Sequence, residues 1–129
     1  MSGNATPPEV RPPRVGPIAH VIRATGHSFK GFRGALASEM AFRLDLALFV
    51  VLVPVALWFG ESGIERAVLV GSLFIVLITE LLNSGIEKCI DRISYEHHKL
   101  SGLAKDFGSA AVFCSLANLV VVWLLVFFD

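Results

Sequence analysis

The amino-acid sequence predicts an all-α membrane protein in which an N-terminal amphipathic surface helix is followed by three transmembrane helices. Hydrophobic residues make up 54% of the 129-residue chain, a share that favours a membrane protein over a water-soluble domain. Three apolar stretches each approach the roughly 20 residues that a helix needs to cross a bilayer. No segment shows the alternation of polar and apolar residues that is typical of a half-buried strand.

A proline-rich tail, residues 1–17, precedes the helices and is predicted to be disordered, because it holds too few apolar side chains to bury a core. Residues 18–38 follow as the predicted surface helix. Apolar side chains recur there every three or four positions, and basic side chains occupy the opposite face, as in helices that lie in a membrane interface. The apolar face comprises Ile18, Val21, Ile22, Thr25, Phe29, Phe32 and Leu36, and the basic face comprises His20, Arg23, His27, Lys30 and Arg33.

Residues 18–129 are predicted to form a single membrane domain, with transmembrane helices at about residues 42–59, 67–90 and 107–128. The fully apolar part of the first helix, residues 46–59, is short, so this helix needs the polar residues Arg43–Asp45 to reach a spanning length. Pro54 is compatible with a helix inside a membrane. The polar residues 91–106 between the second and third helices are expected to form a loop.

The distribution of Lys and Arg predicts how the helices are oriented in the membrane. The N-terminal arm is basic and the connection at residues 88–106 holds four Lys or Arg residues, whereas the turn at residues 60–66 holds one. Counting positive residues therefore places the N-terminus and the second connection in the cytoplasm, and Asp129 outside.

Composition and spacing exclude several other kinds of site. A formal net charge of zero gives no general attraction for nucleic acid. Cys89 and Cys114 are interpreted as small apolar residues in a reducing compartment. The histidines lack the spacing of a zinc site, and residues 26–31 lack the spacing of a P-loop.

Three polar residues, Glu80, Asn83 and Glu87, interrupt the second transmembrane segment, and Asp91 follows just beyond it; we call these four residues the acidic stripe. At about 100° per helical residue they fall within roughly 80° on one face of the helix. No Lys or Arg lies between residues 67 and 87. Carboxylates inside a membrane are costly, so the acidic stripe is predicted to be functional.

The residues alone leave more than one role open for these acids. A poorly hydrated Glu80 could accept or donate a proton, and Glu87 with Glu39 could bind Mg²⁺; alternatively, the acids only bond neighbouring helices. Lys105 could bind a polyphosphate, and Asp106 or Glu96 could accept a hydrogen bond from a ribose or adenine. Equally, Lys105 could be a positive-inside anchor and Asp106 a helix N-cap.

Several motifs resemble the bacterial integral-membrane diacylglycerol kinase family over about residues 18–126. They are GHSFKG at residues 26–31, Glu39 and AFR at residues 41–43, ELLNSGIE at residues 80–87, DRI at residues 91–93, HKLSG at residues 98–102 and AKDFGSAA at residues 104–111. The last segment is more similar to the diacylglycerol branch than to the related undecaprenol kinases.

The resemblance implies a homotrimer whose active sites are shared between subunits at the cytosolic interface, and an ATP-dependent phosphorylation of diacylglycerol to phosphatidic acid. It implies that Glu80 is the general base and that Glu39 and Glu87 bind Mg²⁺ on ATP. The implied nucleotide-binding residues are His20, His27, Glu39, Glu87, Glu96, His97, His98, Lys105 and Asp106. The implied lipid-binding residues are Ala24, Thr25, Ser28, Phe29, Arg33, Phe42, Asp45, Asn83 and Ser109.

This sequence departs from the family pattern at three of those positions. His20 stands where the family usually has Arg, which puts a phosphate contact in doubt. His27 replaces a common Tyr and could alter nucleotide stacking, and Asp45 replaces a common Glu and has a shorter reach. The remaining alternatives are an undecaprenol kinase, a small proton-coupled transporter with Glu80 as its exchanging site, and a helper subunit of a larger complex.

Overall fold

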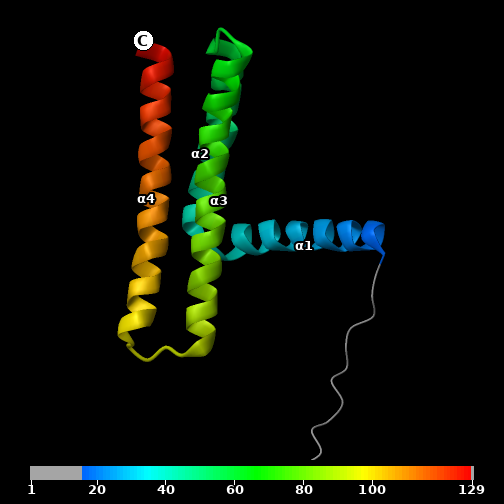
Figure 1. Ribbon diagram of the computed structural model, residues 1–129, viewed down its shortest axis with the longest axis vertical. Coiled ribbons are helices and arrows are strands. Elements are labelled where there is room, and N and C mark those ends of the chain that lie inside the picture. Colours follow the sequence, from blue (N-terminus) through cyan, green and yellow to red (C-terminus); the bar gives the residue numbers. More distant parts are fainter. Residues whose placement is uncertain (1–15, 129) are drawn as a thin grey trace, which may run out of the picture. The chain divides into compact units, whose positions relative to one another are not determined.

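The computed structural model describes residues 16–128, which form four α-helices joined by short connections (Figure 1). The helices are α1 (Pro17–Ser38), α2 (Met40–Phe59), α3 (Gly63–Ile93) and α4 (Lys99–Phe128). By length and composition, α2, α3 and α4 can each cross a membrane. The predicted all-helical fold with three candidate spans is therefore confirmed. Residues 1–15 of the predicted tail, and Asp129, lie outside the described residues.

The chain divides after Phe32 into two compact units. The described part of the first unit is α1 up to Phe32, and this helix starts at Pro17, where the missing N–H costs no helical hydrogen bond. The hydroxyls of Thr25 and Ser28 each donate to the backbone carbonyl four residues earlier, at 2.9 and 3.1 Å. The helix predicted for residues 18–38 is thus present.

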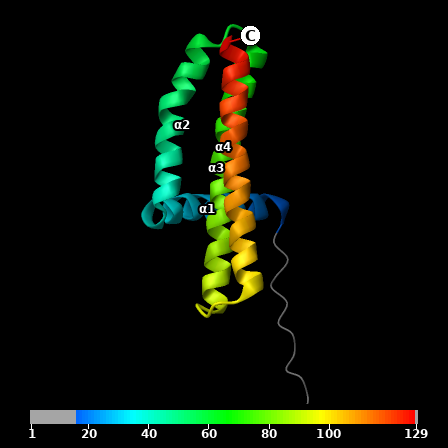
Figure 2. The ribbon, with the colours of Figure 1, turned by 90° about the vertical axis from the view of Figure 1, so that its left-hand side faces the viewer.

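α3 is the central helix of the second unit, which comprises residues 33–129. It packs against both α2 and α4. α4 runs beside α3 in Figure 1, and Figure 2, turned by 90°, shows α2 on another side of α3. Two sides of α3 are therefore covered, one by α2 and the other by α4.

Two apolar clusters hold these helices together. Leu73 and Val76 of α3 pack with Leu119 of α4, and Leu48, Phe49, Leu52, Val53 and Trp123 surround them. The second cluster joins Phe42 and Leu77 to Ala35, which lies in the last turns of α1. Because all six of these central side chains are less than 9% exposed, they fix the register of α3 against its neighbours.

Gly60 makes the turn between α2 and α3 tight. A Cβ at this position would stand 2.7 Å from Cγ of Arg66 and 2.8 Å from the carbonyl oxygen of Ala56, closer than such atoms approach in proteins. Arg66 Nε donates to the Gly60 carbonyl oxygen at 2.9 Å. Ser62 caps α3, since its hydroxyl accepts from the backbone N–H of Glu65 at 3.1 Å.

The connection between α3 and α4 is shorter than the sequence predicts. Residues 94–98 alone separate the two helices, so the expected loop over residues 91–106 is wrong. The alternative role of Asp106 as an N-cap is also wrong, because α4 begins at Lys99 and His98 Nδ1 accepts from the N–H of Leu100 at 3.2 Å. Helices of 31 and 30 residues are about 45 Å long, longer than the ~30 Å hydrocarbon core, so their polar ends continue beyond the apolar stretch.

Candidate active site

The acidic stripe begins on the buried face of α3. Leu69, Leu73 and Val76 are buried on this face, and Glu80 follows in the same helical register with only 5% of its surface exposed. Ser84, one turn further, is also buried. A carboxylate among such neighbours carries a desolvation penalty, which a proton, a cation or a substrate must offset.

Asn83 lies at a close contact between α3 and α4. Its Nδ2 donates to Oε1 of Glu87 at 3.4 Å, and a Cβ on Gly108 of α4 would clash with its Oδ1. Only glycine fits at position 108 while Asn83 keeps this orientation. Within residues 16–128, the buried Oδ1 has no hydrogen-bond donor. This acceptor is therefore a position that a donor group of a substrate can satisfy.

Glu39 connects the start of α2 to α3. Its Oε1 is 2.7 Å from Nζ of Lys88 and accepts a hydrogen bond of 2.9 Å from the hydroxyl of Ser38. The bond from Lys88, followed by the one from Ser38, lowers the pKa of Glu39 below its ordinary value of 4.5. Glu39 is therefore ionised at neutral pH and carries a full negative charge toward α3.

Four carboxylates from two helices and one connection gather in this region. Asp45 of α2, Glu87 of α3 and Glu39 all lie within Coulombic range of Glu80. The structure thus brings together the predicted base, both predicted metal ligands and Asp45. Such a concentration of negative charge favours binding of a cation.

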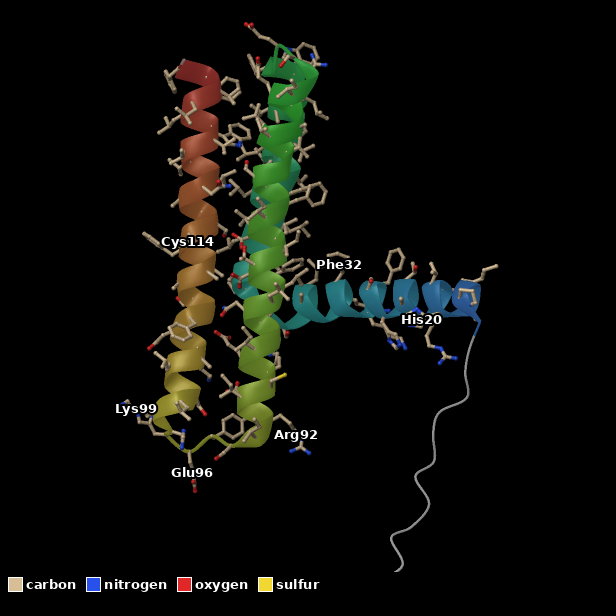
Figure 3. All side chains as sticks on the ribbon, in the orientation of Figure 1. His20, Phe32, Arg92, Glu96, Lys99 and Cys114 are labelled. Carbon is tan, nitrogen blue, oxygen red and sulfur yellow. The ribbon has the colours of Figure 1, made fainter. Side chains whose placement is uncertain are left out.

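A second polar cluster surrounds the connection between α3 and α4. An open hollow of about 200 Å³ is lined there by four of the predicted nucleotide-binding residues, Glu96, His97, His98 and Lys105. Asp106 lines an adjoining hollow together with His97 and His98. Figure 3 shows Arg92, Glu96 and Lys99 at this same end of the helices. The five predicted nucleotide-binding residues that follow α3 in the sequence therefore lie close together.

Lys105 already has a carboxylate partner in this cluster. Its Nζ is 2.8 Å from Oδ1 of Asp91, the last member of the acidic stripe. Glu87 also lies within Coulombic range of Lys105. The ion pair therefore places the predicted phosphate-binding lysine beside the last residues of the acidic stripe.

The predicted lipid-binding residues are distributed over both units. Phe42 is 1% exposed and packs on Ala35 and Leu77, whereas Ser109 is exposed on α4. Arg33 belongs to the second unit and is exposed. The lipid-binding candidates on the first unit are Ala24, Thr25, Ser28 and Phe29, all within α1. The predicted nucleotide-binding residues His20 and His27 also lie in α1.

The donor groups near Glu80 suit Mg²⁺. In the part of the chain that the structure describes, no three His, Cys, Asp or Glu side chains form a ready-made metal site. Mg²⁺ that arrives on a polyphosphate needs only one or two protein carboxylates, because phosphate and water supply the other oxygens. Glu39 and Glu87 provide this set, so the residues present fit the metal.

Sequence reasoning missed three contributors to the site. Lys88 follows Glu87 directly, yet its partner is Glu39, 49 positions earlier in the chain. Gly108 matters only because α4 lies against Asn83. Ser38 donates to Glu39 across a helix break. Each of these contacts joins side chains whose proximity depends on how the helices pack, so no local sequence pattern indicates them.

Residues 26–127 match the family described as prokaryotic diacylglycerol kinase. A diacylglycerol kinase of Escherichia coli strain K12 is 42% identical over 106 residues, which cover 82% of this chain and 87% of that protein. One from Pseudomonas aeruginosa PAO1 is 46% identical over 106 residues, covering 82% and 86%. One from Helicobacter pylori 26695 is 30% identical over 112 residues, covering 87% and 88%. On this evidence the chain belongs to the prokaryotic diacylglycerol kinase family.

Proposed function

We propose that this protein transfers the γ-phosphoryl group of ATP to the hydroxyl of diacylglycerol, giving phosphatidic acid, at the cytoplasmic boundary of a bacterial inner membrane. The observation that carries the proposal is the buried Glu80 within an apolar helix, in a chain similar over most of its length to diacylglycerol kinases. The lipid reaches such a site through the bilayer, while ATP arrives from water. Neither a transporter nor a helper subunit accounts for this similarity.

Glu80 is the proposed general base. The hydroxyl oxygen of the lipid attacks the γ-phosphorus, the bond to the β-phosphate oxygen breaks, and the hydroxyl proton passes to the Glu80 carboxylate. Asp45, Glu87 and Glu39 lie within Coulombic range of Glu80, so a proton taken up by Glu80 reduces the repulsion among these like charges. Within residues 16–128 the buried Oδ1 of Asn83, one helical turn away, has no donor, so it can accept from a second donor group at this site.

Glu39 and Glu87 are the proposed ligands of Mg²⁺ carried by ATP. Bound Mg²⁺ supplies neutralisation of the phosphate charge. Lys105, at the adjoining hollow, offsets charge on the phosphates with donors that its bond to Asp91 leaves available.

We expect Glu87→Gln to move the Mg²⁺ dependence of turnover to higher concentration, measured by titration of Mg²⁺ at fixed ATP. An unchanged Mg²⁺ dependence contradicts the ligand role.

The nucleotide base and ribose are proposed to bind at the connection between α3 and α4, where Glu96, His97, His98 and Asp106 line the two hollows. His20 and His27 on α1 are the proposed additional contacts to the nucleotide. The lipid is proposed to bind along residues Ala24, Thr25, Ser28, Phe29, Arg33, Phe42, Asp45, Asn83 and Ser109.

We also propose that the protein works as a homotrimer with active sites shared between subunits, with the N-terminus in the cytoplasm and the C-terminus outside. Large apolar side chains are exposed on α2 and α4, where lipid tails or neighbouring subunits can pack against them. The count of Lys and Arg supports the orientation.

Transfer of label tests the proposed reaction directly. The purified chain in detergent micelles is given ATP labelled on the γ-phosphate together with short-chain diacylglycerol or undecaprenol. We expect label in phosphatidic acid, and little in undecaprenyl phosphate. Label that moves mainly to undecaprenol identifies an undecaprenol kinase, and proton-linked uptake in vesicles without any label transfer identifies a transporter.

A further inference from the structure

The ion pair between Lys88 and Glu39 lies at the proposed metal ligands, and no role in the reaction has been assigned to it. Lys88 Nζ is 2.7 Å from Oε1 of Glu39, a distance typical of a charge-assisted hydrogen bond. The Glu39 carboxylate is the less exposed partner, with 19% of its side chain exposed against 64% for Lys88. The ammonium group thus reaches from the surface of α3 to a largely covered carboxylate.

The contacts of Glu39 leave one of its oxygens for a metal. Within residues 16–128, the ion pair with Lys88 and the hydrogen bond from Ser38 both fall on Oε1. A metal can therefore approach Oε2, but it then shares a carboxylate whose charge Lys88 already neutralises. The two cations compete for the same negative charge.

The charges around Lys88 explain why it pairs with Glu39. Asp91 and Glu87 also lie within Coulombic range of Lys88, but Asp91 is held by Lys105 and Glu87 accepts from Asn83. Glu39 is the remaining carboxylate within reach. Each of the two lysines thus neutralises one acid of the group when no metal or phosphate is present.

We propose that Lys88 is a positioning residue, a tethered cation that holds Glu39 beside α3 until Mg²⁺ on ATP displaces it. This inference rests on the proposed function, because it takes Glu39 as a metal ligand. It implies that Lys88 keeps the start of α2 against α3 and lowers the affinity of the site for a divalent cation. Release of Lys88 then frees a positive charge beside the incoming phosphates.

Binding of Mn²⁺ together with a non-hydrolysable ATP analogue, followed by electron paramagnetic resonance on the full chain in detergent micelles, tests this idea without turnover. Mn²⁺ shares the octahedral oxygen coordination of Mg²⁺. In Lys88→Met we expect the dissociation constant for Mn²⁺ to fall about two- to fivefold, the range set by the modest strength of an exposed ion pair. Lys88→Gln serves the same purpose with a polar side chain, and Lys88→Arg, which keeps the charge, should remain close to the wild type.

Two controls separate competition from a general effect of charge or of stability. Arg92→Met removes an equal charge at the same end of the helices, outside both hollows, and should leave the Mn²⁺ affinity unchanged. In a Glu39→Gln background, Lys88→Met should have no further effect on Mn²⁺ binding, because the shared carboxylate is gone. A purely structural role of Lys88 moves the melting temperature but not the metal affinity.

Unchanged or weaker Mn²⁺ binding by Lys88→Met overturns the inference, as does the absence of measurable binding in both proteins. Label transfer to diacylglycerol, measured on the same preparations, distinguishes the two proposals. If the wild type transfers label but Lys88→Met shows no gain in Mn²⁺ affinity, only the proposed role of Lys88 is rejected. No transfer by the wild type rejects the proposed function itself.

Discussion

Glu80 carries the sharpest expectation at the scale of single residues. It is buried in an apolar helix, and three other carboxylates lie within Coulombic range. Glu80→Gln keeps the size of the side chain and removes its capacity to accept a proton. We expect turnover to fall about 10²–10⁴-fold, the usual contribution of a general base, while ATP binding is retained. Label transfer and equilibrium binding of a non-hydrolysable ATP analogue measure the two quantities.

Glu61→Gln provides the matched control, because this acid lies in the turn at the other end of α3. Its turnover should equal that of the wild type. If Glu80→Gln folds and turns over normally, the base is another group.

Gly108 is the second residue with a defined prediction. A Cβ at this position would clash with Oδ1 of Asn83, so Gly108→Ala forces the amide to rotate and disturbs its bond to Glu87. We expect a loss of about 1–3 kcal/mol of stability, as for other overpacked sites, together with lower activity. Thermal unfolding in detergent micelles measures the first effect and label transfer the second.

Gly85→Ala is the control, because an added Cβ there meets nothing within 4 Å. The clash also predicts coupling: Asn83→Ala should remove most of the stability cost of Gly108→Ala. Additive losses in the double variant show that the two residues do not contact each other.

At the scale of elements, the turn between α2 and α3 depends on one glycine. Gly60→Ala places a Cβ 2.8 Å from a backbone oxygen, which is less able to move than a side-chain end. We expect a destabilisation of about 1–3 kcal/mol, seen as a lower melting temperature in detergent micelles. Gly63→Ala, whose Cβ meets nothing within 4 Å, should be neutral or stabilising in the first turn of α3. Equal effects of the two substitutions contradict this account of the turn.

The lengths of α3 and α4 show where sequence patterns mislead at this scale. The apolar residues of each helix mark the part that lipid or protein covers, and the sequence prediction ended each span where polarity began. Asp91 and Lys105 instead lie within α3 and α4, and their ion pair links the polar ends of the two helices. A polar helical end and a polar loop have similar compositions, so composition alone does not separate them.

The arrangement of the whole molecule in the membrane is also open to a direct test. The proposed orientation places the 94–98 connection and the 60–62 turn on opposite sides of the bilayer. With Cys89 and Cys114 replaced by alanine, Tyr95→Cys, at a position 90% exposed, should react with an impermeant maleimide in inside-out vesicles, and Glu61→Cys in right-side-out vesicles. Retained label transfer shows that each variant is intact. The reverse labelling pattern rejects the cytoplasmic location of the proposed site.

Four helices, three candidate spans and the face of α3 that carries Glu80 and Glu87 could be predicted from the sequence. These features follow from local periodicity and apolar length, which do not depend on how distant segments pack. The contacts of Lys88 with Glu39, of Lys105 with Asp91 and of Gly108 with Asn83 could be seen only in the folded structure. Each of these contacts depends on how one helix lies against another, and that register is set by packing between residues far apart in the sequence.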